Sequence, residues 1–172
     1  MNAPIPQSTF STELGDPTII TVTLWRGAMI DRFSRAEDAV LLCLRAMRNF
    51  ELPLPSEAFH EGAKARLRAL ILTLENQDFG GAGKGALKSL KALLQLNDTR
   101  TSLAHGKFRL RPGNLEIEWV HPIKGGGLEW KRRSPRLLDL IEELYALDAL
   151  QRALGSQLGH IRKELAVRAR RA

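Results

Sequence analysis

The spacing of the apolar residues is the feature that most constrains how this chain folds. Between Trp25 and Asn49, large apolar side chains recur every three or four positions, which places them on one face of a helix. These side chains are Met29, Ile30, Phe33, Val40, Leu41 and Leu44. We predict one long helix that ends near Asn49, because the two prolines in residues 52–55 cannot continue it.

The segment before this helix is less regular. Residues 1–15 are rich in proline, serine and threonine, and we predict a flexible leader there, followed by a single domain over residues 16–172. Asp16 and Pro17 suit the N-cap and the first position of a helix. The β-branched residues between Thr18 and Leu24 leave both a helix and a strand open for that segment.

Helical spacing returns in three later segments. Ser56 is expected to cap a second helix, with its apolar face from Phe59 to Leu74. A glycine-rich connector at residues 80–85 is expected to precede a third helix over about residues 86–104. Ser134 and Pro135 are expected to begin the last helix. The apolar face of that helix comprises Leu137, Ile141, Leu144, Leu147 and Leu154.

Between the third and last helices the apolar spacing changes from helical to alternating. Phe108 and Leu110 precede a turn at residues 112–114, and alternating apolar residues 115–119 follow it. A second turn at residues 125–127 leads to a short third strand. We therefore predict a mainly α fold: a four-helix up-and-down bundle with a small antiparallel β-hairpin or meander, over about residues 107–131, inserted before the last helix.

Composition restricts the class of protein. Hydrophobic residues make up 44% and charged residues 26% of the chain, as in globular domains. No apolar run approaches the roughly 18–20 residues that span a bilayer, so we expect no membrane association. Cys43, the lone cysteine, is expected in the core. Because a single cysteine cannot form a disulfide within the chain, we expect a reducing, cytoplasmic location. The net charge of +7 favours a polyanionic partner such as RNA.

Two familiar kinds of site are not supported. The sequence GGAGKG at residues 80–85 has Gly85 after its lysine where a phosphate-binding loop needs Ser or Thr, and a helix precedes it instead of a strand. The four histidines, His60, His105, His121 and His160, show no metal-ligand spacing. We therefore predict no metal and no cofactor.

The segment from Asn97 to Gly106 is the best candidate for chemistry. Gly106 suits the residue that follows a helix, so His105 is expected in or just after the last turn, at the negative end of the helix dipole. Arg100 lies about 140° around an ideal helix from His105, and the two could border a common groove. Taken alone, the pair also fits a plain helix end with an exposed arginine and a capping histidine.

Arg100 and His105 form an R-x4-H pattern that ends in Leu103-Ala104-His105-Gly106, and this resembles the signature of the HEPN superfamily. The resemblance implies a homodimer whose two motifs meet at the interface. Many such proteins are metal-independent endoribonucleases of toxin–antitoxin, phage-defence or RNA-processing systems, with a cognate antitoxin or nucleotidyltransferase-type partner. Others are catalytically inactive modules that bind RNA, a nucleotide or a protein. Thr101 departs from the usual pattern, in which Asn, Asp or His follows the arginine.

The resemblance assigns chemistry to the motif. His105 would act as general base or acid on the ribose 2′-hydroxyl, and Arg100 would stabilise charge on the phosphate. Cleavage would leave a 2′,3′-cyclic phosphate and a 5′-hydroxyl. Asn97, Asp98 and Thr101 are candidate supporting residues.

Residues outside the motif have weaker assignments. Glu37 is a candidate to orient the site from the first helix, or an ordinary exposed residue. Five basic residues near the motif could follow an RNA backbone or form a solvated face: Lys107, Arg109, Lys131, Arg132 and Arg133. Trp25, Trp119 and Trp130 are expected in the core, and could stack on bases only if exposed. A helical adaptor unrelated to this superfamily remains the third hypothesis.

Overall fold

The computed structural model describes residues 16–59, 62–123 and 125–170. The predicted leader and His60 lie outside these ranges. The helices are α2 (Pro17–Asn49), α3 (Ala63–Glu75), α4 (Gly80–Gln95), α5 (Asn97–His105) and α6 (Asp139–Ala169), with a short 3₁₀ turn at Ser56–Ala58. The strands are β1 (Lys107–Arg111), β2 (Asn114–Pro122) and β3 (Leu128–Arg133). The prediction of a mainly helical fold with a small antiparallel sheet before the last helix is confirmed.

The N-terminal segment that the sequence left open is helical. Asp16 caps α2, because its side chain accepts a hydrogen bond of 2.7 Å from the backbone N–H of Thr18, and Pro17 occupies the first turn. The β-branched residues that follow are accommodated because Val22 and Trp25 are buried from this helix. Packing of one helical face therefore outweighs the weak β preference of the segment.

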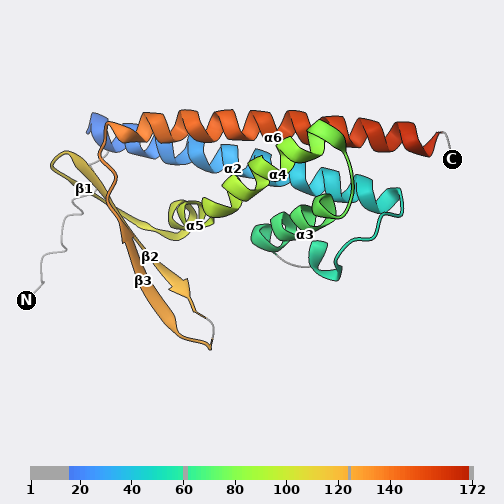
Figure 1. Ribbon diagram of the computed structural model, residues 1–172. Coiled ribbons are helices and arrows are strands. Elements are labelled where there is room, and N and C mark those ends of the chain that lie inside the picture. The colour runs from blue at the N-terminus through green and yellow to red at the C-terminus, as the bar shows by residue number, and fades with distance from the viewer. Residues whose placement is uncertain (1–15, 60–61, 124, 171–172) are drawn as a thin grey trace, which may run out of the picture.

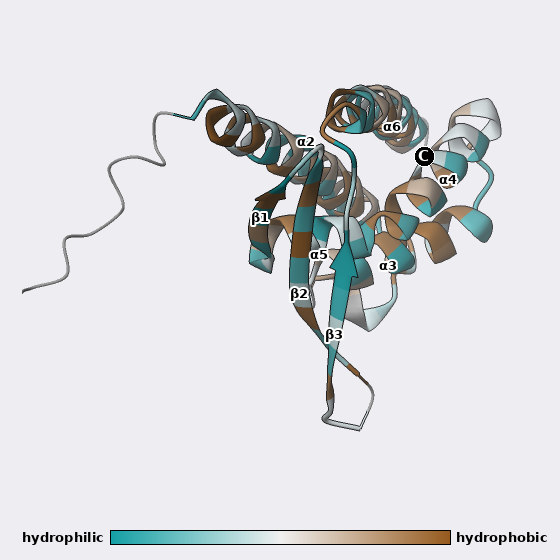
Figure 2. Ribbon diagram, turned by 90° about the vertical axis from the view of Figure 1, so that its left-hand side faces the viewer, coloured by the Kyte–Doolittle hydropathy of each residue, from teal (hydrophilic) through white to brown (hydrophobic). Residues whose placement is uncertain are grey.

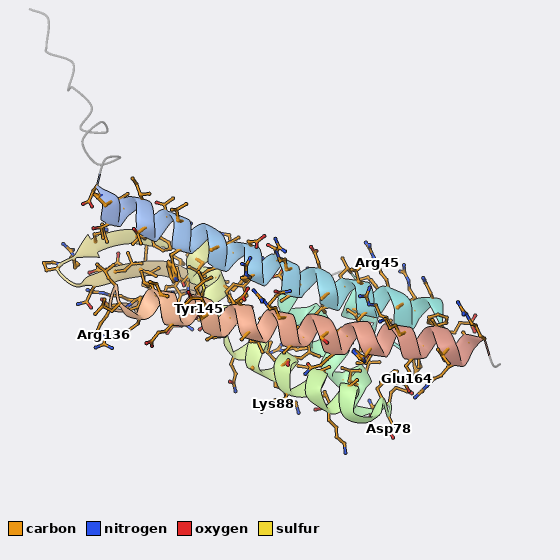
Figure 3. The ribbon with its side chains drawn as sticks, turned by 90° about the horizontal axis from the view of Figure 1, so that it is seen from above. Arg45, Asp78, Lys88, Arg136, Tyr145 and Glu164 are labelled. Atoms are coloured by element: carbon orange, nitrogen blue, oxygen red, sulfur yellow. The ribbon has the colours of Figure 1, made fainter. Side chains whose placement is uncertain are left out.

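The two longest helices, α2 and α6, lie side by side and run in the same direction (Figures 1 and 3). Arg32 of α2 pairs with Asp148 of α6, with 2.5 Å between Nε and Oδ1, and Cys43 lies near Arg162 further along both helices. The sheet between α5 and α6 returns the chain to the end where α2 begins (Figure 1). A strictly up-and-down order of four helices is thus not confirmed.

The helix boundaries differ from the predictions in three places. The second helix begins at Ala63, after a separate 3₁₀ turn at residue 56, and α6 begins at Asp139 instead of Ser134. The predicted third helix is divided at Leu96 into α4 and α5. None of the helices in the described ranges is long and apolar enough to cross a membrane.

The predicted glycine-rich connector is wrong, because residues 80–85 form the first turns of α4. The Asp78 side chain accepts a 2.8 Å hydrogen bond from the Gly80 N–H. An added Cβ at Gly85 would lie 2.6 Å from the Gln157 side chain, so the glycine permits close approach of α4 to α6. Ser89, one turn further on, donates a hydrogen bond of 3.0 Å to Gln157.

Two apolar residues are also misplaced by the predictions. Ile30 and Ile141 are 37% and 58% exposed, although both were expected on buried faces. Each is adjacent to a buried neighbour, Met29 or Leu140. Successive residues of a helix point about 100° apart, so only one of each adjacent pair reaches the core.

The sheet has the order β1-β2-β3 and packs one face against α5 (Figure 2). Arg111 pairs with Asn114 across the predicted first turn, and Pro122 pairs with Leu128 across the second. Leu115, Ile117 and Trp119 alternate along β2 and are buried. Residues between them point to the other face, which is the outer face of the sheet.

Candidate functional site

The candidate site lies on α5, a helix of nine residues that carries both Arg100 and His105. Ser102 and Leu103, in the middle of the motif, are completely buried and anchor this helix. The Ser102 hydroxyl donates a 2.7 Å hydrogen bond to the Thr99 carbonyl, so it needs no partner outside the helix. Arg100 and His105 lie outside this buried face: the Arg100 side chain is partly exposed and His105 is exposed.

Glu37 of α2 orients Arg100. The Arg100 Nε donates to the Glu37 Oε1 at 3.0 Å, and the two side chains are 40% and 18% exposed. This bond occupies Nε and leaves the terminal nitrogens, which carry four of the five donors of an arginine. Glu37 can therefore hold the guanidinium in one orientation while its terminal nitrogens remain available for other contacts.

The carboxyl end of α5, where His105 is exposed, is fixed by Arg26 of α2. The Arg26 Nε donates to the Leu103 carbonyl at 2.7 Å, and its Nη2 donates to the Ala104 carbonyl at 3.3 Å. Its guanidinium also lies 4.4 Å from the centre of the Phe108 ring. Carbonyls in the last turn of a helix lack hydrogen-bond donors within the helix, and here the Arg26 guanidinium donates to two of them. Sequence analysis missed this residue.

Gly106 joins α5 to β1 in an extended conformation, with φ −73° and ψ 149°. The left-handed conformation that favours glycine after a helix is therefore not the reason for this residue. An added Cβ would lie 2.2 Å from the Ser102 carbonyl oxygen and 2.8 Å from the Ile117 side chain. Close packing of the helix end on β2 requires a residue without a Cβ at this position.

The three predicted supporting residues make contacts within the fold. The Thr101 hydroxyl donates to the Asn97 carbonyl at 2.9 Å, one turn earlier in the same helix. Asp98 accepts a 2.7 Å hydrogen bond from the Lys131 Nζ, which joins α5 to β3. The bond from Lys131 lowers the pKa of Asp98. Asp98 therefore links the motif helix to the sheet.

Four of the five predicted RNA-binding residues take part in ion pairs. Lys131 pairs with Asp98 as described, and Arg133 lies 3.3 Å from Glu143 of α6. Arg132 lies 2.7 Å from the Glu116 carboxylate, and Arg109 lies 2.9 Å from Glu118. Lys107 is exposed, and within the part of the chain that the structure describes it has no ion pair.

Glu116 is the centre of a cluster of arginines on the outer face of the sheet. The side chain of Glu116 is only 5% exposed and lies within 3.6 Å of Arg109, Arg111 and Arg132. Burial favours a raised pKa, but the hydrogen bond from Arg111 and the charges of Arg132, Arg111 and Arg109 together lower the pKa of Glu116. One carboxylate thus fixes three guanidinium groups.

Two other kinds of chemistry, metal binding and a reactive thiol, have no support in the described ranges. No group of three or more His, Cys, Asp or Glu residues in residues 16–59, 62–123 and 125–170 could hold a metal ion. Cys43 is completely buried, and burial raises the pKa of its thiol to about 12. Both observations leave Arg100 and His105 as the strongest candidates for chemistry.

No protein-family model matches this chain, and no match is found among curated proteins or solved structures.

Proposed function

We propose that this chain is a HEPN-like, metal-independent endoribonuclease that acts as a homodimer in the cytoplasm, in a toxin, defence or RNA-processing role. The observation that carries the proposal is the arrangement of α5. This helix presents an exposed His105 and an arginine that Glu37 holds in place. Arg26 fixes the last turn, so the two groups lie on a firmly packed element.

The proposed reaction uses Arg100 and His105 of one copy together with His105 of the second copy. Neutral His105 accepts the proton of the ribose 2′-hydroxyl, and the 2′-oxygen attacks the adjacent phosphorus. The guanidinium of Arg100 stabilises the charge that develops on the non-bridging oxygens. The bond to the 5′-oxygen breaks, and that oxygen takes a proton from the imidazolium of the second copy of His105. The products are a 2′,3′-cyclic phosphate and a 5′-hydroxyl.

The homodimer is supported by an apolar groove between the first turns of α2 and α6. The groove is lined by Leu24 and Ile141, which are 68% and 58% exposed, and by buried Trp25. A second copy of the chain would cover these side chains, and large exposed apolar groups commonly mark interfaces. A cognate antitoxin or a nucleotidyltransferase-type partner would bind the assembled dimer.

A second candidate function is a catalytically inactive HEPN-like module that binds RNA, a nucleotide or a protein. A specific observation favours it. Thr101 replaces the usual polar residue of the motif and bonds to its own helix, while Asp98 bonds to Lys131. The single donor of the Thr101 hydroxyl is therefore used within its own helix, and one oxygen of Asp98 is used to join α5 to the sheet.

Cleavage of end-labelled structured RNA in excess EDTA tests the proposal. We expect Arg100→Ala to reduce the rate by about 10²- to 10³-fold and His105→Ala by about 10²- to 10⁴-fold. Arg45→Ala and His160→Ala are the matched controls, because both residues are exposed and lie elsewhere on α2 and α6 (Figure 3 for Arg45). These controls are expected to cleave at the wild-type rate.

Product ends and size complete the test. Cyclic-phosphate ends and a dimer in light scattering would support the nuclease. If the folded wild type cleaves no RNA in a panel of cellular transcripts, the inactive binding module becomes the better explanation.

A further inference from the structure

The outer face of the sheet carries a distinctive set of side chains. Because residues alternate between the two faces of a strand, the strand pairing brings together on this face Lys107, Arg109 and Arg111 of β1, Glu116, Glu118 and Val120 of β2, and Leu128, Trp130 and Arg132 of β3. The opposite face packs against α5 and buries Ile117 and Trp119.

Trp130 is the aromatic residue of this outer face. It is 67% exposed, whereas Trp25 and Trp119 are each 5% exposed, so the prediction that all three lie in the core is wrong for Trp130. The register explains the difference. Trp119 pairs with Lys131, the residue next to Trp130, so Trp119 and Trp130 point to opposite faces of the sheet. Trp130 pairs across the strands with Val120.

The charge of this face is predominantly positive. Four cationic side chains share it with two carboxylates, and one of these, Glu116, is buried beneath Arg109, Arg111 and Arg132. Glu116 therefore fixes the arginines in position while presenting little charge of its own to solvent. An exposed indole beside ordered guanidinium groups complements a base and its phosphates.

We propose that the outer face of the sheet binds unpaired nucleotides of RNA, with a base stacked on Trp130 and the backbone contacting Arg132 and Lys107. Stacking on an open aromatic ring requires a base whose face is free, which a duplex does not offer. The face therefore selects single-stranded over double-stranded RNA. Every base has a flat π-face, so the stacking contact itself is largely independent of sequence.

The register also connects this face to the motif. Lys107 pairs with Glu118, and Glu118 with Arg132, so these residues form one row, and Trp130 lies in the next row. With strands about 4.8 Å apart and about 3.3 Å per residue, the Cα atoms of Trp130 and Lys107 lie about 12 Å apart. Lys107 follows His105 by two residues, so a few nucleotides would reach from Trp130 to His105. The link to cleavage rests on the proposed function, whereas binding does not.

The test is fluorescence anisotropy with a labelled 12-nucleotide oligouridine and a labelled RNA duplex of equal length. We expect Trp130→Ala to weaken oligouridine binding by about 5- to 150-fold, the range for loss of one stacked base. Trp130→Phe is expected to restore most of the affinity. Tyr145→Ala is the matched control, because Tyr145 is 70% exposed on α6, and it is expected to bind as the wild type does (Figure 3). Duplex affinity is expected to be lower and insensitive to Trp130.

Two results would overturn the inference. One is oligouridine binding by a folded Trp130→Ala variant that equals the wild type. The other is conversion of a dimer to a monomer by Trp130→Ala, which would assign this face to a protein contact. Arg100→Ala and His105→Ala separate the two proposals, because both are expected to abolish cleavage while Trp130→Ala still weakens oligouridine binding in either background. Trp130-dependent binding without any cleavage would refute the nuclease and leave this binding face standing.

Discussion

Replacing Gly106 with alanine tests the reasoning about how the motif helix is held. Gly106 ends α5 and begins the passage into the sheet, and its N–H donates to the Ser102 carbonyl at 2.8 Å. The new Cβ would lie 2.2 Å from that carbonyl oxygen. An ordinary close carbon–oxygen contact is about 3.3 Å, so the junction must open by about 1 Å.

The magnitude follows from three contributions. Forcing a methyl group into a packed junction costs about 1–3 kcal/mol. Lengthening the hydrogen bond from the Gly106 N–H removes about 1 kcal/mol. Alanine also lowers the conformational entropy of the unfolded chain, which offsets about 0.4–1 kcal/mol of this destabilisation. We therefore expect Gly106→Ala to lower the free energy of unfolding by about 1–3.6 kcal/mol.

Gly159→Ala is the matched control for this substitution. Gly159 lies inside α6, and a Cβ built on it meets nothing within 4 Å. Alanine has the higher helix propensity, so this variant should gain about 0.5–1 kcal/mol. Urea unfolding followed by circular dichroism gives both values by linear extrapolation. If Gly106→Ala is as stable as the wild type while Gly159→Ala shows its gain, the junction between α5 and β1 has room for a Cβ and the reasoning is refuted.

Three further outcomes are expected. Arg26→Ala should destabilise the fold by about 1–3 kcal/mol, measured by urea unfolding, because charged hydrogen bonds to two carbonyls of α5 are lost. Cys43, with a pKa of about 12, should not react with a thiol reagent at pH 8 until the chain is unfolded, and rapid reaction of the native protein would contradict its burial. The hydrogen bond from Lys131 lowers the pKa of Asp98 in the folded protein. The pair therefore stabilises the fold above pH 3.8, the ordinary aspartate pKa, and this stabilisation is lost as the pH falls through the lowered pKa. In the Asp98→Asn variant, the free energy of unfolding should therefore decrease less steeply with falling pH below about pH 4. The same pH dependence as in the wild type would contradict the pairing.

Local signals predicted the elements whose formation depends on local chemistry. The change from helical to alternating spacing located the sheet, and the turn at residues 112–114 joins Arg111 to its pairing partner Asn114. Asp16 and Pro17 marked the start of α2 at its observed position. Capping and turn formation involve neighbours in sequence, and a sequence pattern therefore contains the necessary information.

Elements that depend on distant contacts were predicted incorrectly. The glycines of residues 80–85 suggest a loop because glycine is a poor helix former, yet here the lack of a side chain lets α4 contact Gln157 of α6. Alternation placed Leu128 and Trp130 on one face of β3 but did not say which face α5 would cover. In both cases the missing information was the identity of the packing partner.

The candidate site shows the same division. Arg100 and His105 share one helix, consistent with the predicted helix end before Gly106, and Glu37 contacts the arginine from α2. Arg26 fixes the end of the motif helix, but it lies 77 residues before Leu103 and has no distinctive sequence neighbourhood. A contact between a side chain and a distant backbone carbonyl leaves no periodic or motif signal.

The net charge of +7 overstates the attraction that this protein would have for a polyanion such as the proposed RNA. On the sheet, Arg109 and Arg132 already pair with carboxylates, so phosphates that bind there must compete with Glu116 and Glu118. Affinity from phosphate contacts scales with the number of cations that neutralise them, and paired cations contribute less than that number suggests. The aromatic contact at Trp130 has no such competitor. If the outer face binds RNA as proposed, its discrimination between RNA forms should follow the availability of an unstacked base more than the density of phosphates.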